Sequence, residues 1–301
     1  MPSLRSRLIN ALIRHRHLLR GRLHREVFTL ASSIPAFRAQ CRQSARRLSH
    51  PPEGVSVEAT TLAGLPAEWL TPIGAPTDKV ILYSHGGGYV SGNSAEHRGF
   101  VAKFARTLGF AALTYDYRLA PEHPFPAAID DALAVYRALL ERFDARDILL
   151  AGESAGGGLS LALLFAIKQH SLPFPSAAIA ISPWTDLTCA SPAYRTRNAR
   201  SVAPRDSWTV FAHHYAATHD RHDPLMSPCF GDPTGFPPLL INAGEDGRSF
   251  AEKARCAGVE VSFQAGVGMI HCYPLLAPIF PEASAAMREI TAFAQRHLGG
   301  H

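Results

Sequence analysis

From residue 78 onward, the chain alternates short apolar runs with longer segments of helical character. The short runs are rich in Val, Ile, Leu and Tyr, which are typical of strands. Strands that alternate with helices in this way predict an α/β fold, a mostly parallel sheet with helices on both faces. Residues 50–77 would add an antiparallel edge. We expect strands near 79–85, 110–117, 147–154, 177–184, 238–246 and 259–266, and helices near 94–108, 127–142, 155–170, 248–257 and 280–297.

A proline-rich stretch at residues 185–237 interrupts this alternation. It contains the helical-looking sequence RDSWTVFAHHYAA and is long for a loop inside a compact domain. We therefore expect a cap that is discontinuous in sequence, formed by residues 1–50 and 185–237. The α/β core would consist of residues 51–184 and 238–301.

Residues 1–50 carry most of the charge imbalance of the chain. They hold eleven Arg and one acidic residue, so the formal charge of the remaining chain is 5 − 10 = −5. Leu8 and Leu12 are four residues apart, as are Ile9 and Ile13, which is typical of an amphipathic helix. We interpret this segment as a lid whose Leu and Ile face covers the active site. A membrane-surface or targeting helix is one alternative, and a nucleic-acid patch is another, although no nucleic-acid-binding motif accompanies it.

The sequence shows no apolar run of membrane-spanning length and no secretory signal pattern. We therefore expect a cytoplasmic protein without stable membrane insertion. The five cysteines are scattered and form no Cys-x-x-Cys pair, so we expect mostly buried thiols. The histidines between residues 213 and 222 match no zinc signature, and we expect neither a metal nor a cofactor.

One serine lies between two glycines in the sequence Gly152-Glu153-Ser154-Ala155-Gly156. The motif falls where an expected buried strand meets an expected helix. A sharp strand-to-helix turn exposes the serine hydroxyl, and the glycines let strand and helix pass closely. Ligands of open α/β sheets bind at such strand ends. The pattern predicts that Ser154 is a nucleophile, and the alternative is a small-residue turn with an incidental serine.

A second glycine-rich motif, His85-Gly86-Gly87-Gly88, follows the first expected parallel strand. Because glycine lacks a Cβ, the backbone N–H groups of this loop can approach a ligand oxygen directly. The motif resembles an oxyanion loop. The expected oxyanion donors are the N–H groups of Gly86, Gly87 or Gly88, together with that of Ala155.

Together, the two motifs resemble those of the hormone-sensitive-lipase-like (family IV) esterases of the α/β-hydrolase superfamily. The similarity covers most of residues 78–275 and includes YDYRLAPEHPFPAAIDDA, SPWTDLT, DPLMSP and GMIH. It implies acyl transfer, with His271 as the general base that deprotonates Ser154. Glu153 stands where this family usually has Asp. Arg118 and Glu122 look like a structural ion pair without a catalytic role.

The acid of the catalytic triad is where the chain departs most from that family. Relatives usually carry a longer loop with an aspartate after the strand that corresponds to PLLINAG, whereas here GEDGRSF runs straight on. If the gap follows Asp246, this residue matches the family aspartate and should accept the His271 Nδ1–H bond. Glu245 is the substitute. If the gap precedes Glu245, the acid is absent and both residues form only the acidic first turn of a helix.

The resemblance implies a serine carboxylesterase that hydrolyses short-chain acyl esters through a Ser154-His271-Asp246 triad. Lactone hydrolysis or deacetylation at the same site is an alternative. A catalytically impaired hydrolase that serves as a small-molecule binding protein is another. The expected partner is a small-molecule ester and no nucleic acid, and the sequence leaves a homodimer open.

Overall fold

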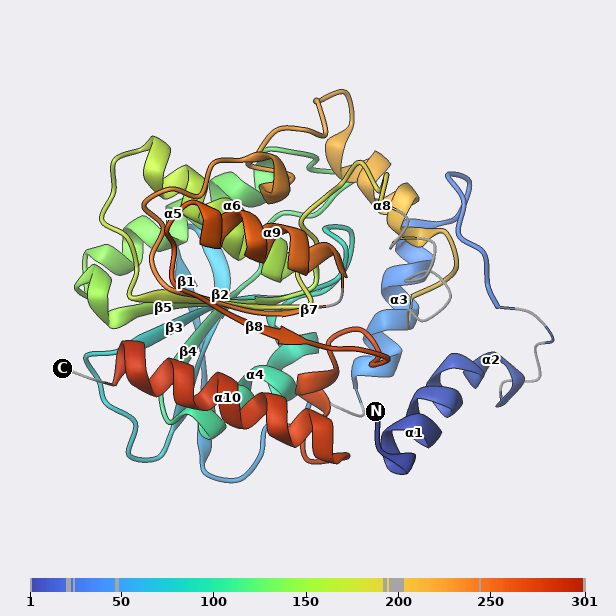
Figure 1. The fold of residues 1–301 in the computed structure, drawn as a ribbon, viewed down its shortest axis with the longest axis horizontal. Coiled ribbons are helices and arrows are strands. Elements are labelled where there is room, and N and C mark those ends of the chain that lie inside the picture. The colour runs from blue at the N-terminus through green and yellow to red at the C-terminus, as the bar shows by residue number, and fades with distance from the viewer. Residues whose placement is uncertain are drawn as a thin grey trace.

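The computed structural model describes residues 2–19, 23, 25–46, 49–191, 194, 203–243 and 245–299. Eight strands of this part of the chain form one sheet in the order β1-β2-β4-β3-β5-β6-β7-β8 (Figure 1). Neighbours are antiparallel at β1–β2 and β2–β4 and parallel elsewhere. The predicted α/β fold and its antiparallel edge are therefore confirmed. The strands are β1 (Val55–Leu62), β2 (Leu65–Pro72), β3 (Val80–Ser84), β4 (Ala111–Tyr115), β5 (Ile148–Glu153), β6 (Ala177–Ile181), β7 (Leu239–Ala243) and β8 (Val261–Ala265).

Helices cover both faces of the sheet. In Figure 1, α5, α6 and α9 lie on one face, whereas α4 and α10 lie on the other. Every residue of the five strands from β3 to β7 is buried, as expected of strands covered on both sides. The core helices are α4 (Ser94–Leu108), α5 (Ala127–Leu140), α6 (Ala155–Gln169), α9 (Glu245–Cys256) and α10 (Pro281–Leu298).

Four further helices lie past the ends of β7 and β8 in Figure 1: α1 (Leu4–Arg14), α2 (Arg16–Leu19), α3 (Ile34–Ala45) and α8 (Ser207–Ala216). Val27 forms a parallel bridge with Arg205, which joins the N-terminal segment (residues 1–50) to the segment of residues 185–237. The rings of Phe28 and Phe37 each lie within 5.4 Å of the Phe211 ring. The two segments outside the α/β core therefore pack against each other.

The N-terminal segment differs from its sequence-based expectation. The helix ends at Arg14, and its inward side carries Ile9 and Ile13, which pack against the core. Leu8 and Leu12 are 62% and 49% exposed and face away from the protein. The expectation that the Leu positions cover the active site is therefore wrong, because successive residues of a helix lie about 100° apart and only one side can contact the core.

The five cysteines are also less buried than expected. All are free thiols; Cys256 is exposed and the other four are half-buried. None of the helices that the structure describes is long and apolar enough to cross a membrane.

Candidate active site

Ser154 occupies the sharp turn between β5 and α6. Its backbone has φ 57° and ψ −121°, a conformation that is strained for a residue with a side chain. A Cβ on Gly156 would lie 2.0 Å from the Ser84 carbonyl oxygen, and a Cβ on Gly152 would lie 2.4 Å from the Gly156 oxygen. Both positions therefore require glycine. The turn is held by hydrogen bonds from the Ser154 N–H to the Ile181 carbonyl, and from the Trp184 N–H to the Ser154 carbonyl, each 2.9 Å long.

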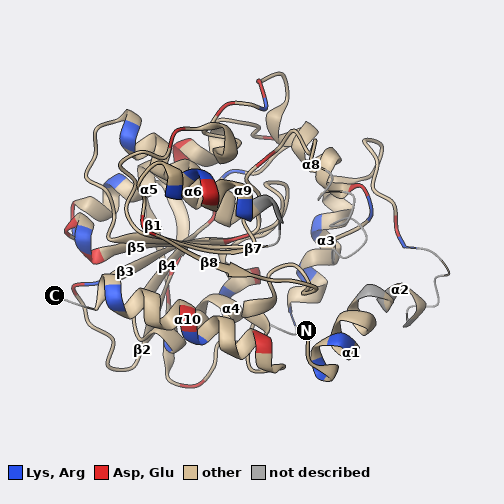
Figure 2. Cartoon of the chain, in the orientation of Figure 1, with Lys and Arg blue, Asp and Glu red and all other residues tan. Residues whose placement is uncertain are grey.

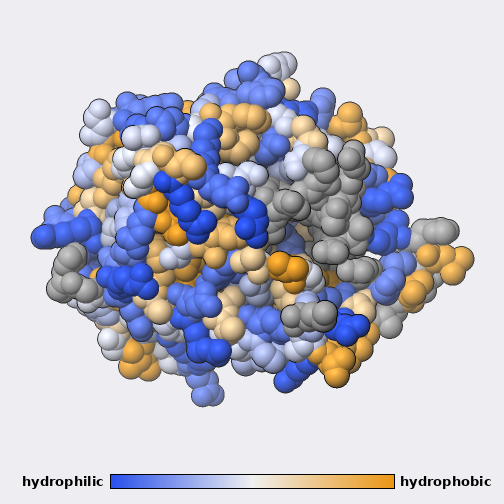
Figure 3. Space-filling view, in the orientation of Figure 1, coloured by the Kyte–Doolittle hydropathy of each residue, from blue (hydrophilic) through white to orange (hydrophobic). Residues whose placement is uncertain are grey.

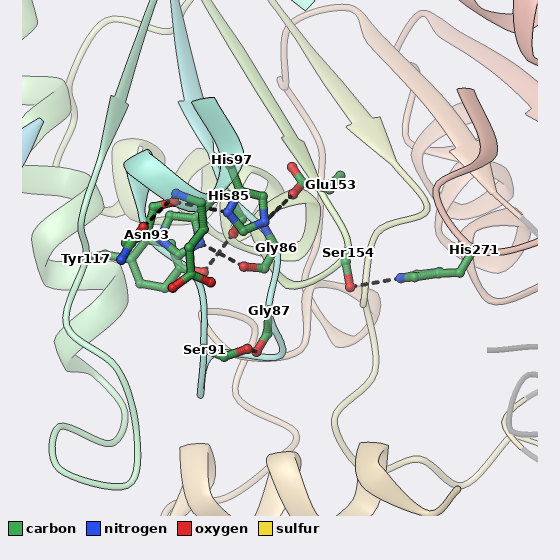
Figure 4. A network of polar contacts seen from close by, with 11 residues as sticks. His85, Gly86, Gly87, Ser91, Asn93, His97, Tyr117, Glu153, Ser154 and His271 are labelled. Atoms are coloured by element: carbon green, nitrogen blue, oxygen red, sulfur yellow. Dashed lines mark hydrogen bonds and ion pairs between the residues drawn. The ribbon is translucent and has the colours of Figure 1, made fainter. Parts of the chain in front are cut away.

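His271 lies beside this serine although 117 residues separate the two in sequence. Its Nε2 is 2.9 Å from the Ser154 Oγ, and the two side chains point toward each other in Figure 4. The loop after β8 carries the histidine, and the Cys272 N–H anchors this loop by donating to the Ser182 hydroxyl at 3.0 Å. The edge of the Trp208 ring packs on the imidazole, with ring centres 5.2 Å apart. The imidazole is thus oriented for proton exchange with the serine hydroxyl.

The loop of three glycines passes on the other side of Ser154. Gly87 and Gly88 have φ values of +124° and +67°. A Cβ on Gly88 would lie 2.4 Å from the Phe211 ring, so the α8 aromatic side chain packs directly on this glycine. The Gly86 N–H donates to the Glu153 Oε1 at 2.7 Å. Because this N–H already has an acceptor, Gly86 is not a free oxyanion donor, contrary to one of the options given by the sequence.

Glu153 is part of a buried network behind the glycine loop (Figure 4). Its Oε1 also lies 3.3 Å from the His97 Nε2. The His97 Nδ1 faces the Asn93 carbonyl oxygen at 3.1 Å, and because a carbonyl can only accept, this nitrogen carries the hydrogen. Burial raises the pKa of Glu153, which favours a neutral carboxyl, while His97 acts in the opposite direction. The Glu153 carboxyl and the His97 imidazole therefore form a polar contact next to the loop.

His85 packs within the same network. Its ring is stacked between His97 and Tyr117, with centroid distances of 5.0 and 4.2 Å. Burial, and to a lesser degree His97, lowers its pKa to about 3, so the ring is neutral and its Nδ1 can donate to the Gly86 carbonyl at 2.8 Å. The Tyr117 hydroxyl donates to the His85 carbonyl at 2.7 Å. These contacts fix the start of the loop from both sides.

We expect Glu153→Ala to lower kcat/KM by about 10²-fold, because the Gly86 N–H loses its acceptor and the loop shifts. Glu153→Gln should keep most of the activity, since an amide oxygen can also accept this hydrogen bond. Steady-state kinetics of the two variants measure the difference. A Gln variant as impaired as the Ala variant would show that the charge, not the hydrogen bond, matters.

The same Gln variant should change the pH dependence of stability. The native protein keeps the Glu153 proton to a higher pH than the unfolded chain does. The contribution of Glu153 to the free energy of unfolding is therefore fully present below the ordinary pKa of 4.5. That contribution is lost as the pH rises through the raised pKa. Relative to the unmodified protein, Glu153→Gln should therefore gain free energy of unfolding as the pH rises, measured by urea denaturation. If the free energy of unfolding changed with pH in the same way in both proteins, the raised pKa of Glu153 would be contradicted.

A cavity of about 650 Å³ opens above Ser154 and His271. Its walls come from both segments outside the α/β core as well as from the glycine loop. Cys41 is a wall residue, but burial raises its pKa to about 11, so the thiol is protonated at neutral pH and does not compete as a nucleophile. Other residues that line the cavity are Ile13, His17, Phe37, Gln40, Pro204, Ser207, Trp208, Phe211, Leu275 and Leu276.

The expected acid lies at the edge of the described structure. β7 ends at Ala243 and α9 begins at Glu245, so Glu245 and Asp246 both lie in the first turn of this helix. Their side chains lie outside the described residues, and the proposed bond from Asp246 to His271 remains a prediction.

The ion pairing of the YRLAPEH stretch differs from the expectation. Arg118 pairs with Asp131 of α5 at 2.8 Å, whereas Glu122 pairs with Arg38 of α3 at 2.7 Å. The predicted pair between Arg118 and Glu122 is therefore wrong, because each of the two residues pairs with a residue of a helix instead. Within the described part of the chain, no three His, Cys, Asp or Glu side chains gather where they could hold a metal ion.

Comparison with known proteins agrees with this arrangement. The alpha/beta hydrolase fold family matches residues 81–275. An acetyl-hydrolase of Streptomyces hygroscopicus is 38% identical over 251 residues, which are 80% of this chain and 83% of the relative. An esterase of Acinetobacter venetianus is 34% identical over 80% of this chain and 82% of its own. The crystal structure of an esterase from the bacterial hormone-sensitive lipase family superposes with a TM-score of 0.87 at 32% identity, covering 99% of both chains.

The chain belongs to the hormone-sensitive-lipase-like α/β hydrolases. As a member of this family it is a carboxylic-ester hydrolase. The predictions of the family and of the enzyme class are therefore confirmed. The sequence analysis did not identify the contacts that the aromatic side chains of α8 make in the site. Trp208 and Phe211 lie in a helix that was expected, but its hydrophobic pattern does not say which residues meet His271 and Gly88.

Proposed function

We propose that this hydrolase cleaves short-chain acyl esters with Ser154 as the nucleophile. The observation that carries the proposal is the 2.9 Å contact between the His271 Nε2 and the hydroxyl of a serine on a strained strand-to-helix turn. To accept the hydroxyl proton, Nε2 must be unprotonated, so Nδ1 carries the imidazole hydrogen. Asp246 is the proposed acceptor of that hydrogen.

The proposed reaction has two stages. His271 takes the Ser154 proton while the serine oxygen attacks the ester carbonyl, and the resulting imidazolium then protonates the departing alcohol. In the second stage His271 deprotonates a water molecule, which attacks the acyl-enzyme and releases the acid. The serine oxygen recovers its proton from the imidazolium.

The oxyanion formed in each stage needs donors close to Ser154. We assign this role to the N–H groups of Gly87, Gly88 and Ala155, for which no acceptor occurs among the described residues. Ala155 is the first residue of α6, where an N–H has no partner within the helix and the helix dipole favours negative charge. Three preorganised donors would stabilise the developing charge without rearrangement.

The cap is the second part of the proposal. Residues 1–50 and 185–237 together supply one wall of the 650 Å³ cavity, a volume typical of pockets that bind small molecules. The 38% identity to a protein named acetyl-hydrolase favours deacetylation as a second candidate activity. The contact between His271 and Ser154 argues against a protein that only binds its ligand.

The experiment that tests the proposal combines turnover with covalent trapping. The protein should hydrolyse p-nitrophenyl butyrate in the presence of EDTA, and phenylmethanesulfonyl fluoride should abolish this activity by transferring its sulfonyl group to the Ser154 oxygen with loss of fluoride. Mass spectrometry of the digested protein should find one label, on Ser154. Full inhibition with the label on another residue, or no turnover of any short ester, would overturn the proposal.

A further inference from the structure

The inner side of helix α1 carries two polar residues beside Ile9 and Ile13, whereas its three leucines face solvent. Ser6 is fully buried and Asn10 is 7% exposed, whereas Leu4 is 80% and Leu8 62% exposed. Leu12, one further turn along, is 49% exposed. A helix that served only to cover its own core would bury this leucine stripe. The stripe therefore calls for another explanation.

Polar contacts hold the helix in this orientation. The Ser6 hydroxyl lies 3.2 Å from the Glu282 Oε1, and the Ser3 hydroxyl donates to the Glu282 Oε2 at 3.0 Å. One turn further, the Asn10 side chain donates to the Gly268 carbonyl at 3.0 Å. These bonds tie the inner side of α1 to α10 and to the loop that precedes His271. They prevent the helix from rotating its leucines inward.

Arginines border the leucine stripe. With about 100° between successive residues of a helix, Arg5 and Arg7 fall on opposite flanks of the line through Leu4, Leu8 and Leu12. Both arginines are exposed. The first acidic residue of the chain is Glu26, so α1 carries no negative charge. Figure 2 shows only basic residues among the charged positions of α1, and Figure 3 shows apolar surface where this helix lies.

We propose that the outer face of α1 binds the surface of an anionic lipid bilayer. An apolar stripe bordered by arginines is the composition of helices that lie in the bilayer interface, with the leucines among the acyl chains and the cations at the headgroups. A second copy of the chain fits this face poorly. Two such helices would bring together segments that each hold eleven arginines against one acid, and like charges repel.

The position of α1 gives this binding a consequence for the active site. Ile13, on the inner side of the same helix, lines the cavity above Ser154, as does His17 of α2. Binding through the leucine stripe would place the cavity close to the bilayer, where apolar esters concentrate. This consequence rests on the proposed ester hydrolysis, but vesicle binding does not, so either can fail without the other.

Sedimentation with vesicles tests the proposal. The full chain should bind vesicles of phosphatidylcholine containing about one third phosphatidylglycerol at low salt, and should bind pure phosphatidylcholine vesicles at least about tenfold more weakly. Leu4→Ser/Leu8→Ser/Leu12→Ser should lower binding to the anionic vesicles about tenfold while hydrolysis of soluble p-nitrophenyl butyrate stays unchanged. Arg5→Gln/Arg7→Gln should reduce both the binding and its sensitivity to salt.

The matched control changes two exposed apolar residues outside the N-terminal segment, in Ile73→Ser/Phe230→Ser, and should bind like the unmodified protein. Equal loss in this control would mean that general surface hydrophobicity, not α1, causes binding. Equal binding to neutral and anionic vesicles, or none to either, would overturn the proposal. So would a dimer, detected by analytical ultracentrifugation, that the triple leucine variant converts to a monomer, because a second chain would then cover the stripe.

Discussion

Ser154→Ala should lower kcat for p-nitrophenyl butyrate by about 10⁶-fold, to a rate near that of the ester in buffer. The proposed mechanism has no other nucleophile: the Ser154 Oγ lies 2.9 Å from the His271 Nε2, and the two side chains face each other in Figure 4. Removing the nucleophilic serine of a triad in serine proteases costs a factor of this size, because the members act as a unit. Steady-state kinetics with high enzyme concentration would measure the residual rate.

Ser176→Ala is a suitable control for this variant. The Ser176 hydroxyl donates to the Ile148 carbonyl at the opposite end of β5 from Ser154, at 2.9 Å. This control tests whether removing a serine hydroxyl near β5 lowers activity merely by destabilising the fold. We expect the control to keep its activity. Turnover by Ser154→Ala at the unmodified rate would overturn the assignment of the nucleophile.

Asp246→Asn should lower kcat by about 10⁴-fold with little change in KM. An asparagine at the acid position favours the wrong tautomer of the histidine, so Nε2 carries the hydrogen and cannot accept the Ser154 proton. The start of α9 at Glu245 places Asp246 after β7, at the same edge of the sheet as the loop after β8 that carries His271. Burst and steady-state kinetics on the same ester would separate acylation from substrate binding.

Glu245→Gln is the matched control, since the two acids are neighbours in the first turn of α9. It should leave kcat nearly unchanged. The reverse result, with a large loss in Glu245→Gln alone, would assign the acid to Glu245. Near-normal rates in both variants would show that the acid lies elsewhere or that His271 works without one.

Most of the sheet could be predicted from the sequence because buried parallel strands leave a strong local signal. All six expected strands from β3 to β8 are present, and their ends fall within three residues of the prediction. The errors concentrate at the carboxyl ends, for example in β7, which ends at Ala243 and not at Asp246. At these ends the chain leaves the sheet and forms the loops of the site. Apolar residues and residues that favour strands continue into these loops, so they do not mark where the strand ends.

The contacts between distant segments could not be predicted in the same way. The sequence places Ser154 on a turn and His271 late in the chain, and the α/β topology brings both to one edge of the sheet. No local pattern, however, indicates that Glu122 pairs with Arg38 or that Glu153 binds the Gly86 N–H. Likewise, the spacing of four between Leu8 and Leu12 identifies a helix but not which of its sides meets the protein.

The contact between Phe211 and Gly88 couples the position of α8 to that of the glycine loop. The Phe211 ring occupies the space that a side chain at position 88 would need, with only 2.4 Å between the ring and the place of a Cβ. A displacement of α8 to admit or release a bulky molecule therefore removes support from the loop that carries the proposed oxyanion donors. The Phe211 ring thus both lines the cavity and supports this loop, so a change at this position should alter substrate access and transition-state stabilisation together.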